Sequence, residues 1–540
     1  MKKSFIALCA TVLAFAACQK DEVKVVPELK VSSETAITVE KDGGIFNVEF
    51  ESNVAWTAAL DVEKEAATLN LTSGTADDKK VKVTVNPLTE DNATRVITLT
   101  LTPENGEGVK VVFTQNGPYV PYFEVSATEL NFGKEGGSQE FTINTNCTNI
   151  TVDAPEIGTI KVSEDFTTAT FTMPASTSWS AISDRVKFTV EEIQDAVKDD
   201  NGNETGETEA HTVRVYANLE GFGQTVYATE FTDAIKEGTS YNTALAGDYF
   251  LVANGTSTIH AYEKATGKYA TAITAVGDVT GLCNDEAGNI VLMTGGGSDP
   301  MVTYFVPAAT PFEASTYKAG FSVNNEMPSS IGYNNISANG NVLSGDALID
   351  VFTGCGASVG AYNVCFALKD GKYTDGDYTD YVTIKYTSET KTLWNSKWGV
   401  ARHVSTAVEG GVYYSAYDDN YELFYNATMS SANWKIACAS GSDWSNGIVS
   451  MEYAQFNGHK YLVAYSYSFV PGMYSYIALF NIDDPAAPVL EDRYPVLGYT
   501  GDDYNTADMS VEVVDGNLNV YIVDYSQYAV IKCVLAPISK

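Results

Sequence analysis

The sequence Phe-Asn-Val-Glu-Phe at residues 46–50 alternates apolar and polar side chains, and this pattern decides the fold. Successive side chains of a β-strand point to opposite faces, so a period of two places the apolar residues on one buried face. A similar strand-like run occupies residues 109–113, and Gly, Asn, Asp and Pro turns separate such runs. Long helical stripes are almost absent. We therefore expect an all-β chain.

An internal repeat divides the N-terminal part of the chain into two copies. The repeat pairs Val31 with Val125, Gly43 with Gly136, Asn53 with Asn146 and Arg95 with Arg185. The offsets of 90 to 94 residues match the length of an immunoglobulin-like β-sandwich, which is about 100 residues. We expect one sandwich at residues 24–117 and a second at residues 120–231.

The order of motifs in the first copy resembles a known module. An Asp-Gly-Gly triplet at residues 42–44 precedes a strand, Asn53 and Trp56 follow it, Arg95 opens a later strand, and the copy ends in Phe-Thr-Gln-Asn-Gly at residues 113–117. This order resembles the BACON domain, a Bacteroidetes-associated carbohydrate-binding module that is often N-terminal. The resemblance implies an immunoglobulin-like fold and an association with glycans, although such modules can also act only as spacers.

The second copy departs from this pattern. It has no tryptophan at the position of Trp56, and it carries an insert, Gln194 to Ala210, that is rich in Asp, Asn, Gly and Glu. Because Asn-Gly favours tight turns, we expect a long hairpin that turns at residues 201–202. Calcium binding by the insert is the alternative.

The N-terminus predicts export. Two lysines precede the apolar run at residues 5–17, which is too short to span a bilayer and is typical of a signal peptide. The run ends before Cys18 in a pattern that resembles a lipobox, at which the cysteine is acylated, although Phe15 departs from the usual aliphatic residue. We expect residues 1–17 to be a signal peptide and residues 18–27 a lipidated tether. Ordinary cleavage that leaves a thiol is the alternative.

The tether and the overall charge bear on location and partners. Cys-Gln-Lys-Asp-Glu at residues 18–22 resembles the signal that sends lipoproteins of Bacteroidota to the outer face of the outer membrane; a merely solvated tether is the alternative. The chain has 33 Lys and Arg against 69 Asp and Glu, a net charge of −36. This acidity disfavours nucleic acid as a partner. It suits either solubility or repulsion from anionic lipopolysaccharide.

The composition changes near residue 232, because 29 of the 33 tyrosines follow that position. Beyond it, turns that contain glycine repeatedly precede apolar strands, at Gly247, Gly288, Gly340, Gly410, Gly458 and Gly516. If residues 233–540 are divided among six such units, each unit has about 51 residues. This is close to the length of one four-stranded propeller blade. We expect residues 233–540 to form a six-bladed β-propeller that folds alone. Because the spacing is uneven, the sequence also allows seven blades or an irregular β-domain.

The chain contains few catalytic or metal-binding patterns. Its four histidines have no metal-ligand spacing, and we expect neither a catalytic residue nor a metal site. Residues 356–360 fit the G-x-S-x-G pattern, but this motif needs a following helix, and residues 361–368 have the pattern of a strand. A glycosidase pair, with Asp443, Asp502 and Asp503 as candidates, is the enzymatic alternative.

Cysteines and acidic loops leave a disulfide and calcium binding open. Most cysteines lie in apolar strand-like runs, where cysteine packs as a small hydrophobic residue, but Cys355 and Cys365 are spaced to allow a disulfide. The acidic segments 375–380 and 418–422 are turns or calcium sites.

Tryptophans in polar loops are the best ligand-binding candidates: Trp394, Trp398, Trp434 and Trp444, together with Asp443. Sugar C–H faces stack on aromatic rings, while nearby Asn and Asp hydrogen-bond hydroxyl groups. The structural alternative is that these tryptophans close apolar seams between blades. Trp56 and Trp179 are expected to be core residues.

Three functions follow from these observations. The first is a surface glycan-binding lipoprotein, an accessory of a SusC/SusD-type uptake system, in which the propeller is the receptor and the sandwiches are spacers. The second is an interaction protein that docks on a transporter or captures a peptide or host protein. The third is a glycan-cleaving enzyme, which requires carboxylates that converge in one pocket.

We predict that Cys18→Ala leaves an unlipidated protein that is released from the membrane or retained as precursor, because we expect no other segment to hold the chain there. Detergent phase partitioning measures this. Continued partitioning of the variant into the detergent phase would contradict the expected anchor.

Overall fold

The computed structural model describes residues 25–236, 241–296, 299–308, 318–323, 332–354, 362–373, 382–385, 400–407, 410–415, 423–427, 435–438, 447–467, 474–498, 507–524 and 528–538. Apart from the helical turn α1 (Asp233–Lys236), the described elements are β-strands, which confirms the all-β expectation. The chain forms two compact units. The first comprises residues 1–124, 144–150 and 190–211, and the second comprises the remaining residues.

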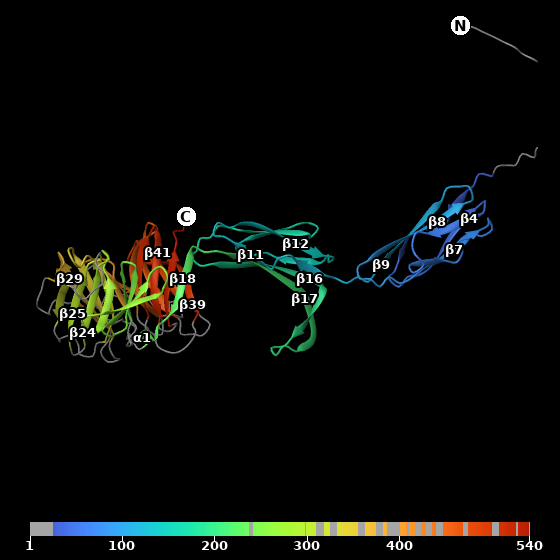
Figure 1. Cartoon of the computed structure of the whole chain (residues 1–540). Helices are drawn as coiled ribbons and strands as arrows, with labels where there is room; N and C mark the ends of the chain where they lie inside the picture. The colour runs from blue at the N-terminus through green and yellow to red at the C-terminus, as the bar shows by residue number, and fades with distance from the viewer. Residues whose placement is uncertain are drawn as a thin grey trace, which may run out of the picture. The chain divides into compact units, whose positions relative to one another are not determined.

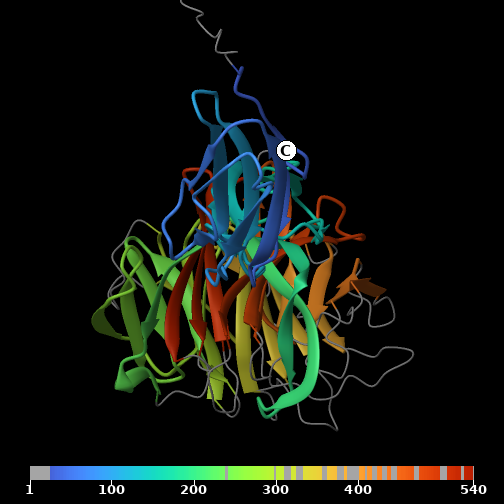
Figure 2. The same cartoon turned by 90° about the vertical axis from the view of Figure 1, so that its right-hand side faces the viewer.

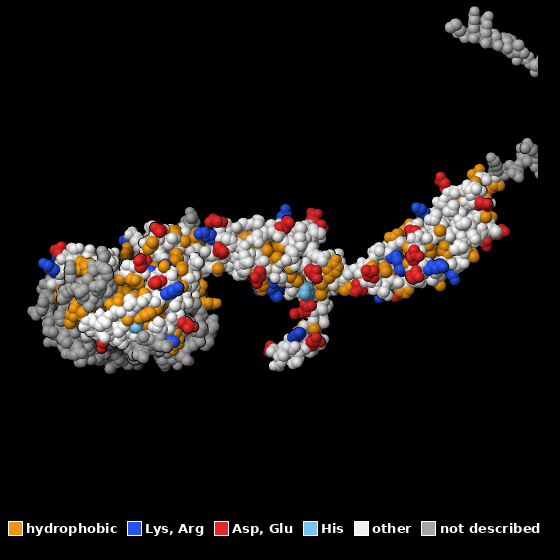
Figure 3. Space-filling view, in the orientation of Figure 1, with side chains coloured by type: hydrophobic (Ala, Val, Ile, Leu, Met, Phe, Trp, Pro, Cys, Tyr) orange, Lys and Arg blue, Asp and Glu red, His pale blue; other side chains and the backbone are white. Residues whose placement is uncertain are grey.

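The first copy of the repeat forms two facing sheets. Their strands, in spatial order, are β1 (Leu29–Val31), β3 (Gly44–Ser52), β7 (Lys80–Val85) and β5 (Ala67–Leu69), and then β2 (Ala36–Val39), β9 (Val109–Asn116), β8 (Thr94–Pro103), β4 (Trp56–Leu60) and β6 (Ser73–Gly74). Alternate residues of β3 and β8 are buried, as a period of two requires. Trp56 is 2% exposed and lies in the core between the sheets. Acidic and basic side chains are interspersed on the visible surface of this sandwich (Figure 3).

The order of motifs in this sandwich has a physical cause. Gly43 has a φ of +73°, and a Cβ there would lie 2.2 Å from the carbonyl oxygen of Val85. Gln115 is fully buried, and its Nε2 donates to the carbonyl oxygens of Glu40, Lys41 and Asn86. Arg95 donates to Gln115 Oε1 from Nε at 3.1 Å. The glycine turn and the final strand are therefore linked through one buried amide.

The second copy repeats this strand order. One sheet runs β10 (Phe123–Val125), β12 (Gly137–Thr145), β15 (Thr168–Met173) and β14 (Thr159–Val162), and the other runs β11 (Glu129–Phe132), β17 (Glu204–Leu219), β16 (Ile182–Lys198) and β13 (Ile150–Asp153). In both copies the second strand along the chain pairs in parallel with the last strand of the copy, β2 with β9 and β11 with β17.

The insert of the second copy is a hairpin, as expected. Strands β16 and β17 extend through it, and Gly202 turns the chain with a φ of +82°. Asp199 Oδ1 accepts hydrogen bonds from the backbone N–H groups of Asn201 and Asn203, both at 2.9 Å. This carboxylate therefore stabilises the turn itself, which favours the hairpin over calcium binding.

Six further sheets lie between Gly223 and Leu535 in the described part of the chain. Each is named after the strand that comes first in it along the chain, leaving aside β18, which precedes α1. The first three are the β19 sheet, with β19 (Asn242–Ala246), β20 (Tyr249–Ala253), β21 (Thr258–Glu263) and β22 (Tyr269–Thr274); the β23 sheet, with β23 (Val279–Asn284), β24 (Ile290–Gly296), β25 (Asp299–Val306) and β26 (Lys318–Val323); and the β27 sheet, with β27 (Gly332–Gly340), β28 (Ala347–Gly354), β29 (Tyr362–Lys369), β30 (Lys372–Tyr373) and β31 (Val382–Lys385).

The remaining three follow the same plan. They are the β32 sheet, with β32 (Val400–His403), β33 (Val412–Ser415), β34 (Leu423–Asn426) and β35 (Lys435–Cys438); the β36 sheet, with β36 (Gly447–Phe456), β37 (His459–Tyr467), β38 (Tyr474–Asn481) and β39 (Val489–Gly498); and the β40 sheet, with β40 (Ala507–Val514), β41 (Asn517–Asp524), β42 (Ala529–Leu535) and β18 (Gly223–Glu230).

These six sheets form a closed circle. The first strand of each sheet contacts the first strand of the next, and β40 contacts β19. Strand β18, green in Figure 1, lies beside the red C-terminal strands because it pairs with β42 from Gly223↔Leu535 to Glu230↔Ala529. In Figure 2 red strands likewise stand beside green ones.

The position of β18 corrects a sequence expectation. The repeat places residues 223–230 in the second sandwich, but in the structure they complete the β40 sheet. The rise in tyrosine content near residue 232 comes after β18 and so does not mark the start of the six sheets. Strand β18 alternates partly buried and exposed residues, as a sandwich strand does, so its own pattern does not assign it to the β40 sheet.

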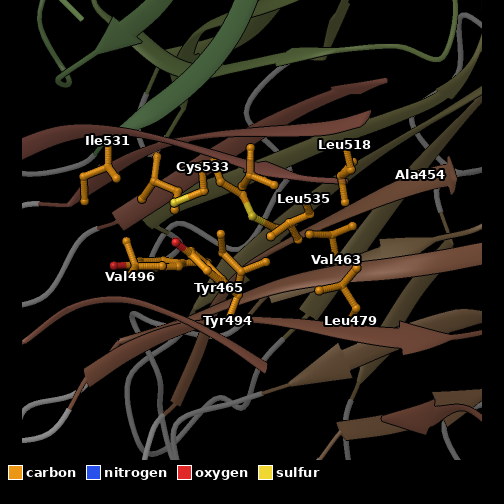
Figure 4. Close-up of a cluster of buried hydrophobic side chains, with 14 of the residues drawn as sticks. Ala454, Val463, Tyr465, Leu479, Tyr494, Val496, Leu518, Ile531, Cys533 and Leu535 are labelled. Atoms are coloured by element: carbon orange, nitrogen blue, oxygen red, sulfur yellow. The ribbon is translucent and has the colours of Figure 1, made fainter. Parts of the chain in front are cut away.

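Apolar seams separate neighbouring sheets. In the seam between the β36 and β40 sheets, side chains such as Val463, Cys533 and Leu535 gather in one core (Figure 4). Trp179 of the second sandwich belongs to the same core and is 1% exposed. Its Nε1 donates to the carbonyl oxygen of Ala536 at 2.8 Å, and its backbone N–H donates to Asp492 Oδ2 at 2.7 Å. Trp179 is thus a core residue, as expected.

We predict that a fragment of residues 233–540 does not fold alone, in contrast to the sequence expectation, because it lacks β18 and Trp179. Loss of a buried tryptophan alone costs about 3 to 5 kcal/mol. A fragment of residues 120–540 keeps both features and should unfold cooperatively. Thermal unfolding followed by circular dichroism compares the two fragments. A cooperative transition of the shorter fragment at the same temperature would show that neither feature is needed.

Candidate functional site

Polar side chains link each sheet to the next around the circle, from the first strands at most seams, and from β28 or the turns after β23 and β27 at the others. The linked atoms are Asn284 Oδ1 and Leu245 N (2.6 Å), Asp285 Oδ2 and Val342 N (2.8 Å), Asp350 Oδ1 and His403 Nδ1 (2.6 Å), Arg402 Nη2 and Glu452 Oε2 (3.1 Å), Ser450 Oγ and Asp508 Oδ1 (2.7 Å), and Asp508 Oδ2 and Thr243 N (2.8 Å). Each seam between sheets thus has at least one polar link.

A cavity of about 590 Å³ opens among these strands. Residues of β19, β23, β32, β36 and β40 line it, so five of the six sheets contribute their first strand. The volume lies within the range of ligand-binding pockets, roughly 300 to 1,000 Å³. Its charged lining residues are Lys264, Asp285, Glu286, Arg402, Glu452 and Glu512.

Arg402 is the most informative of these residues. Its side chain is 3% exposed, and Nη2 reaches Glu452 Oε2 at 3.1 Å and the carbonyl oxygen of Ala338 at 3.4 Å. Its Nε and Nη1 atoms are buried without a hydrogen-bond partner among the described residues. Buried donors without acceptors cost about 1 to 3 kcal/mol each, and more when the group is charged. Arg402 therefore has unused capacity to donate hydrogen bonds at the cavity.

Burial controls the ionisation of the acidic partners. The pKa of Glu452 is raised to about 7, chiefly because burial disfavours its charged form, although Arg402 acts in the opposite direction. Burial also raises the pKa of Asp508 to about 6, against hydrogen bonds from Ser450 and Thr243 that lower it. Glu452, which lines the cavity, is thus able to change protonation near neutral pH.

Two further lining residues of the cavity, Lys264 and Glu512, form an ion pair. Lys264 Nζ lies 2.9 Å from Glu512 Oε2, and Glu512 Oε1 accepts a hydrogen bond from Tyr521 at 2.9 Å. Asp285 has a different role, because its carboxylate accepts hydrogen bonds from the backbone and side chain of Asn289 and from Val342 N. It holds two sheets together.

The cavity therefore combines donors from Arg402 and Lys264 with acceptors from Glu452 and Glu512. Tyr453 adds an aromatic ring to the lining. Hydroxyl groups both donate and accept hydrogen bonds, so a hydroxyl-rich molecule matches this mixture better than an apolar one.

A second hollow, of about 460 Å³, lies on the second sandwich. It is lined by Asp153, Lys187, Arg185 and Tyr216, among others. Lys187 Nζ pairs with Asp153 Oδ2 at 2.8 Å, and Tyr216 is 38% exposed. An exposed ring beside paired charges can also receive a sugar.

The ligand-binding residues predicted from the sequence lie outside the described residues. This holds for Trp394, Trp398, Trp434, Trp444 and Asp443, and also for Cys18 and for Asp502 and Asp503. The possible calcium segments at 375–380 and 418–422 lie there as well. These expectations stay predictions.

The structure bears in part on the nucleophile-elbow pattern and on the cysteines. The described residues that follow the G-x-S-x-G pattern form strand β29, not the helix that a nucleophile elbow requires. Cys147, Cys283 and Cys533 are buried without a disulfide, as small hydrophobic residues would be. Cys365 is also buried without a disulfide, which argues against the bridge that its spacing from Cys355, itself outside the described residues, allows.

Sequence reasoning missed Arg402 and Glu452. Each is a charged residue inside an apolar strand, in Val-Ala-Arg-His at residues 400–403 and Ser-Met-Glu-Tyr at residues 450–453. A charge at such a position costs free energy unless it is paired, so it signals either an ion pair or a ligand.

We predict that Glu452→Gln removes part of the pH dependence of stability. The pKa of Glu452 rises from 4.5 to about 7 on folding. Because the folded state binds the proton more tightly, wild type should lose stability relative to the variant as the pH rises from about 4.5 to about 7, by at most about 3 kcal/mol. Urea unfolding of both proteins across this interval measures the difference. A difference that is constant with pH would contradict the raised pKa.

Comparisons with known proteins give limited information. Within the described residues, no helix is long and apolar enough to cross a membrane. No family model and no curated protein matches the chain. Among solved structures, the chain is similar to two tandem Ig domains of titin (11% identity, 36% of this chain, 97% of that chain, TM-score 0.21). It is also similar to the β-propeller domain of Myceliophteria thermophila Cps50 (Swd1) (9% identity, 57% of this chain, 99% of that chain, TM-score 0.30). At these TM-scores neither similarity bears on function.

Proposed function

We propose that residues 223–540 form a six-bladed β-propeller that binds a glycan in the cavity described above. The six sheets and the closed circle of their first strands support this blade count. The observation that carries the binding proposal is the pair of unused Arg402 N–H donors beside Glu452 in a cavity of about 590 Å³. Sugar hydroxyls supply acceptors for Arg402 and donors for the carboxylates.

The ligand is proposed to be neutral. Arg402 and Lys264 are each paired with a glutamate, and Glu286 adds a further negative charge to the lining. An anionic ligand would therefore meet repulsion both here and from the chain's net charge of −36. A neutral glycan avoids this repulsion and still uses every donor and acceptor.

The location and partners of the protein complete the proposal. A lipid at Cys18 would anchor the chain to the outer membrane at the cell surface, and the two sandwiches would act as spacers. The glycan would be passed to a SusC/SusD-type uptake system, and no cofactor is required. Support for this part comes from the sequence resemblances alone. Docking on a transporter, or capture of a peptide or host protein, is the competing hypothesis.

We predict that a glycan selected on an array with the full chain loses affinity at least tenfold when Arg402→Met is combined with Glu452→Gln. The double substitution removes the guanidinium donors and the carboxylate charge together and leaves no unpaired buried charge. Isothermal titration calorimetry measures the affinity, and the melting temperature checks folding. Arg185→Met is the matched control, because it removes an arginine from the hollow of the second sandwich, and it should bind as wild type does.

The same experiment distinguishes the cavity from competing sites. Loss of binding in Arg185→Met but not in the double variant would move the site to the second sandwich. Loss only on substitution of Trp394, Trp398 or Trp444 would move it to the predicted aromatic platform. If the array shows no glycan bound by the folded full chain, the proposal fails and the interaction-protein hypothesis replaces it.

A second candidate function is supported by one observation. The cavity brings together carboxylates from separate strands, and the pKa of Glu452, at about 7, suits a proton donor. A glycan-cleaving enzyme needs such an acid and a second carboxyl group, and Glu512 also lines the cavity. Shorter sugars released by wild type, and not by Glu452→Gln, would support glycan cleavage over simple binding.

A further inference from the structure

One seam of the circle contains a polar cluster instead of the apolar side chains that fill others. Ser337, Asp350 and Cys365 lie directly opposite one another on β27, β28 and β29, because the strand register pairs Ser337 with Asp350 and Asp350 with Cys365. Residues at one register position share a face of the sheet. The β27 sheet therefore presents a row of three polar side chains.

His403, on the neighbouring β32, meets this row. Its Nδ1 lies 2.6 Å from Asp350 Oδ1, and its backbone N–H donates to Asp350 Oδ2 at 3.2 Å. The Cys365 thiol lies 3.1 Å from Asp350 Oδ1. His403, Asp350 and Cys365 are 0%, 1% and 2% exposed. One nitrogen, one oxygen and one sulfur donor thus meet in a fully buried place.

We propose that Asp350, Cys365 and His403 bind one divalent transition-metal ion, zinc by preference, between the β27 and β32 sheets. The three donor atoms lie within 4.8 Å of one another. Imidazole, thiolate and carboxylate are the ligands that zinc uses in proteins. Each ligand comes from a different strand, so the backbone fixes their relative positions.

The surroundings of the cluster support a bound ion. Ser337 Oγ lies 3.5 Å from Asp350 Oδ2 and, with the His403 backbone N–H, orients the carboxylate as outer partners of metal ligands do. Asn339 lies two residues after Ser337, on the same face of β27, and both polar atoms of its amide are buried without a partner among the described residues. Buried amides are normally satisfied, so Asn339 has hydrogen-bonding capacity for a further polar species such as a metal-bound water.

The chemistry of binding is balanced without a redox step. Cys365 loses its thiol proton to solvent as the sulfur–metal bond forms, and His403 binds as the neutral imidazole. A tetrahedral zinc ion places its donor atoms about 3.3 to 3.7 Å apart. The Asp350 and His403 donors, now 2.6 Å apart, must therefore separate by about 1 Å when the ion binds.

The test uses the full chain and cobalt as a spectroscopic probe for zinc. After treatment with a chelator, titration with Co²⁺ should give one equivalent bound, with tetrahedral visible bands and a sulfur-to-cobalt absorption. Zinc should displace cobalt and raise the melting temperature, and a chelator should reverse this rise. Folded wild-type protein that binds no metal would overturn the proposal and leave a hydrogen-bonded network.

Variants assign the ligands. Cys365→Ser, which is nearly isosteric, should abolish the sulfur-to-cobalt absorption, and His403→Gln should lower metal affinity at least tenfold. Cys283→Ala is the matched control, since it alters another buried cysteine in the same circle of sheets and should retain the absorption. Near-ultraviolet circular dichroism checks folding. If folded Cys365→Ser keeps the absorption, another cysteine binds the metal and the assignment is wrong.

Discussion

The pairing of β18 with β42 is the constraint on which the closed circle of sheets depends. Seven residue pairs, from Gly223↔Leu535 to Glu230↔Ala529, join segments that are about 300 positions apart in sequence. Without β18 the β40 sheet would expose the edge of β42. Because β18 pairs with β42 and continues along the chain towards β19, it also connects the last sheet of the circle to the first. The strand follows the second sandwich directly in the chain, so the segment that leaves that sandwich completes the last sheet of the circle.

The polar links between neighbouring sheets explain why the cavity is charged. A circle of sheets packed only by apolar seams would leave the backbone and side chains at its centre without partners. Here Asn284, Asp285 and Asp508 satisfy backbone N–H groups of neighbouring strands. The Arg402–Glu452 pair differs, because it leaves two arginine donors unused among the described residues. Stability alone does not favour such a pair over apolar residues, which is consistent with the ligand proposed above.

The sequence predicted what local patterns determine. The period of two predicted the strands, and the Gly43 and Gly136 turns predicted the repeat, because both have positive φ values that glycine tolerates best. Asn201-Gly202 likewise predicted its hairpin. The candidate sites were beyond such reasoning, since Asp350 and Cys365 meet only through strand register, and His403 reaches them only through the packing of two sheets. The Arg402–Glu452 pair and the place of β18 depend on the same long-range order.

The two sandwiches show how a repeat keeps a fold and changes a role. Asn53 and Asn146 bind the incoming chain in the same way, through Val26 and Glu28 in one copy and Val120 and Tyr122 in the other. The repeated arginines have diverged: Arg95 donates to the buried Gln115, whereas Arg185 lines a hollow. The second copy also supplies Trp179, whose indole lies in the core of the β36 and β40 sheets. The sequence of the second copy is therefore constrained by the circle of sheets as well as by its own fold. This gives a physical reason why it departs from the sequence of the first copy.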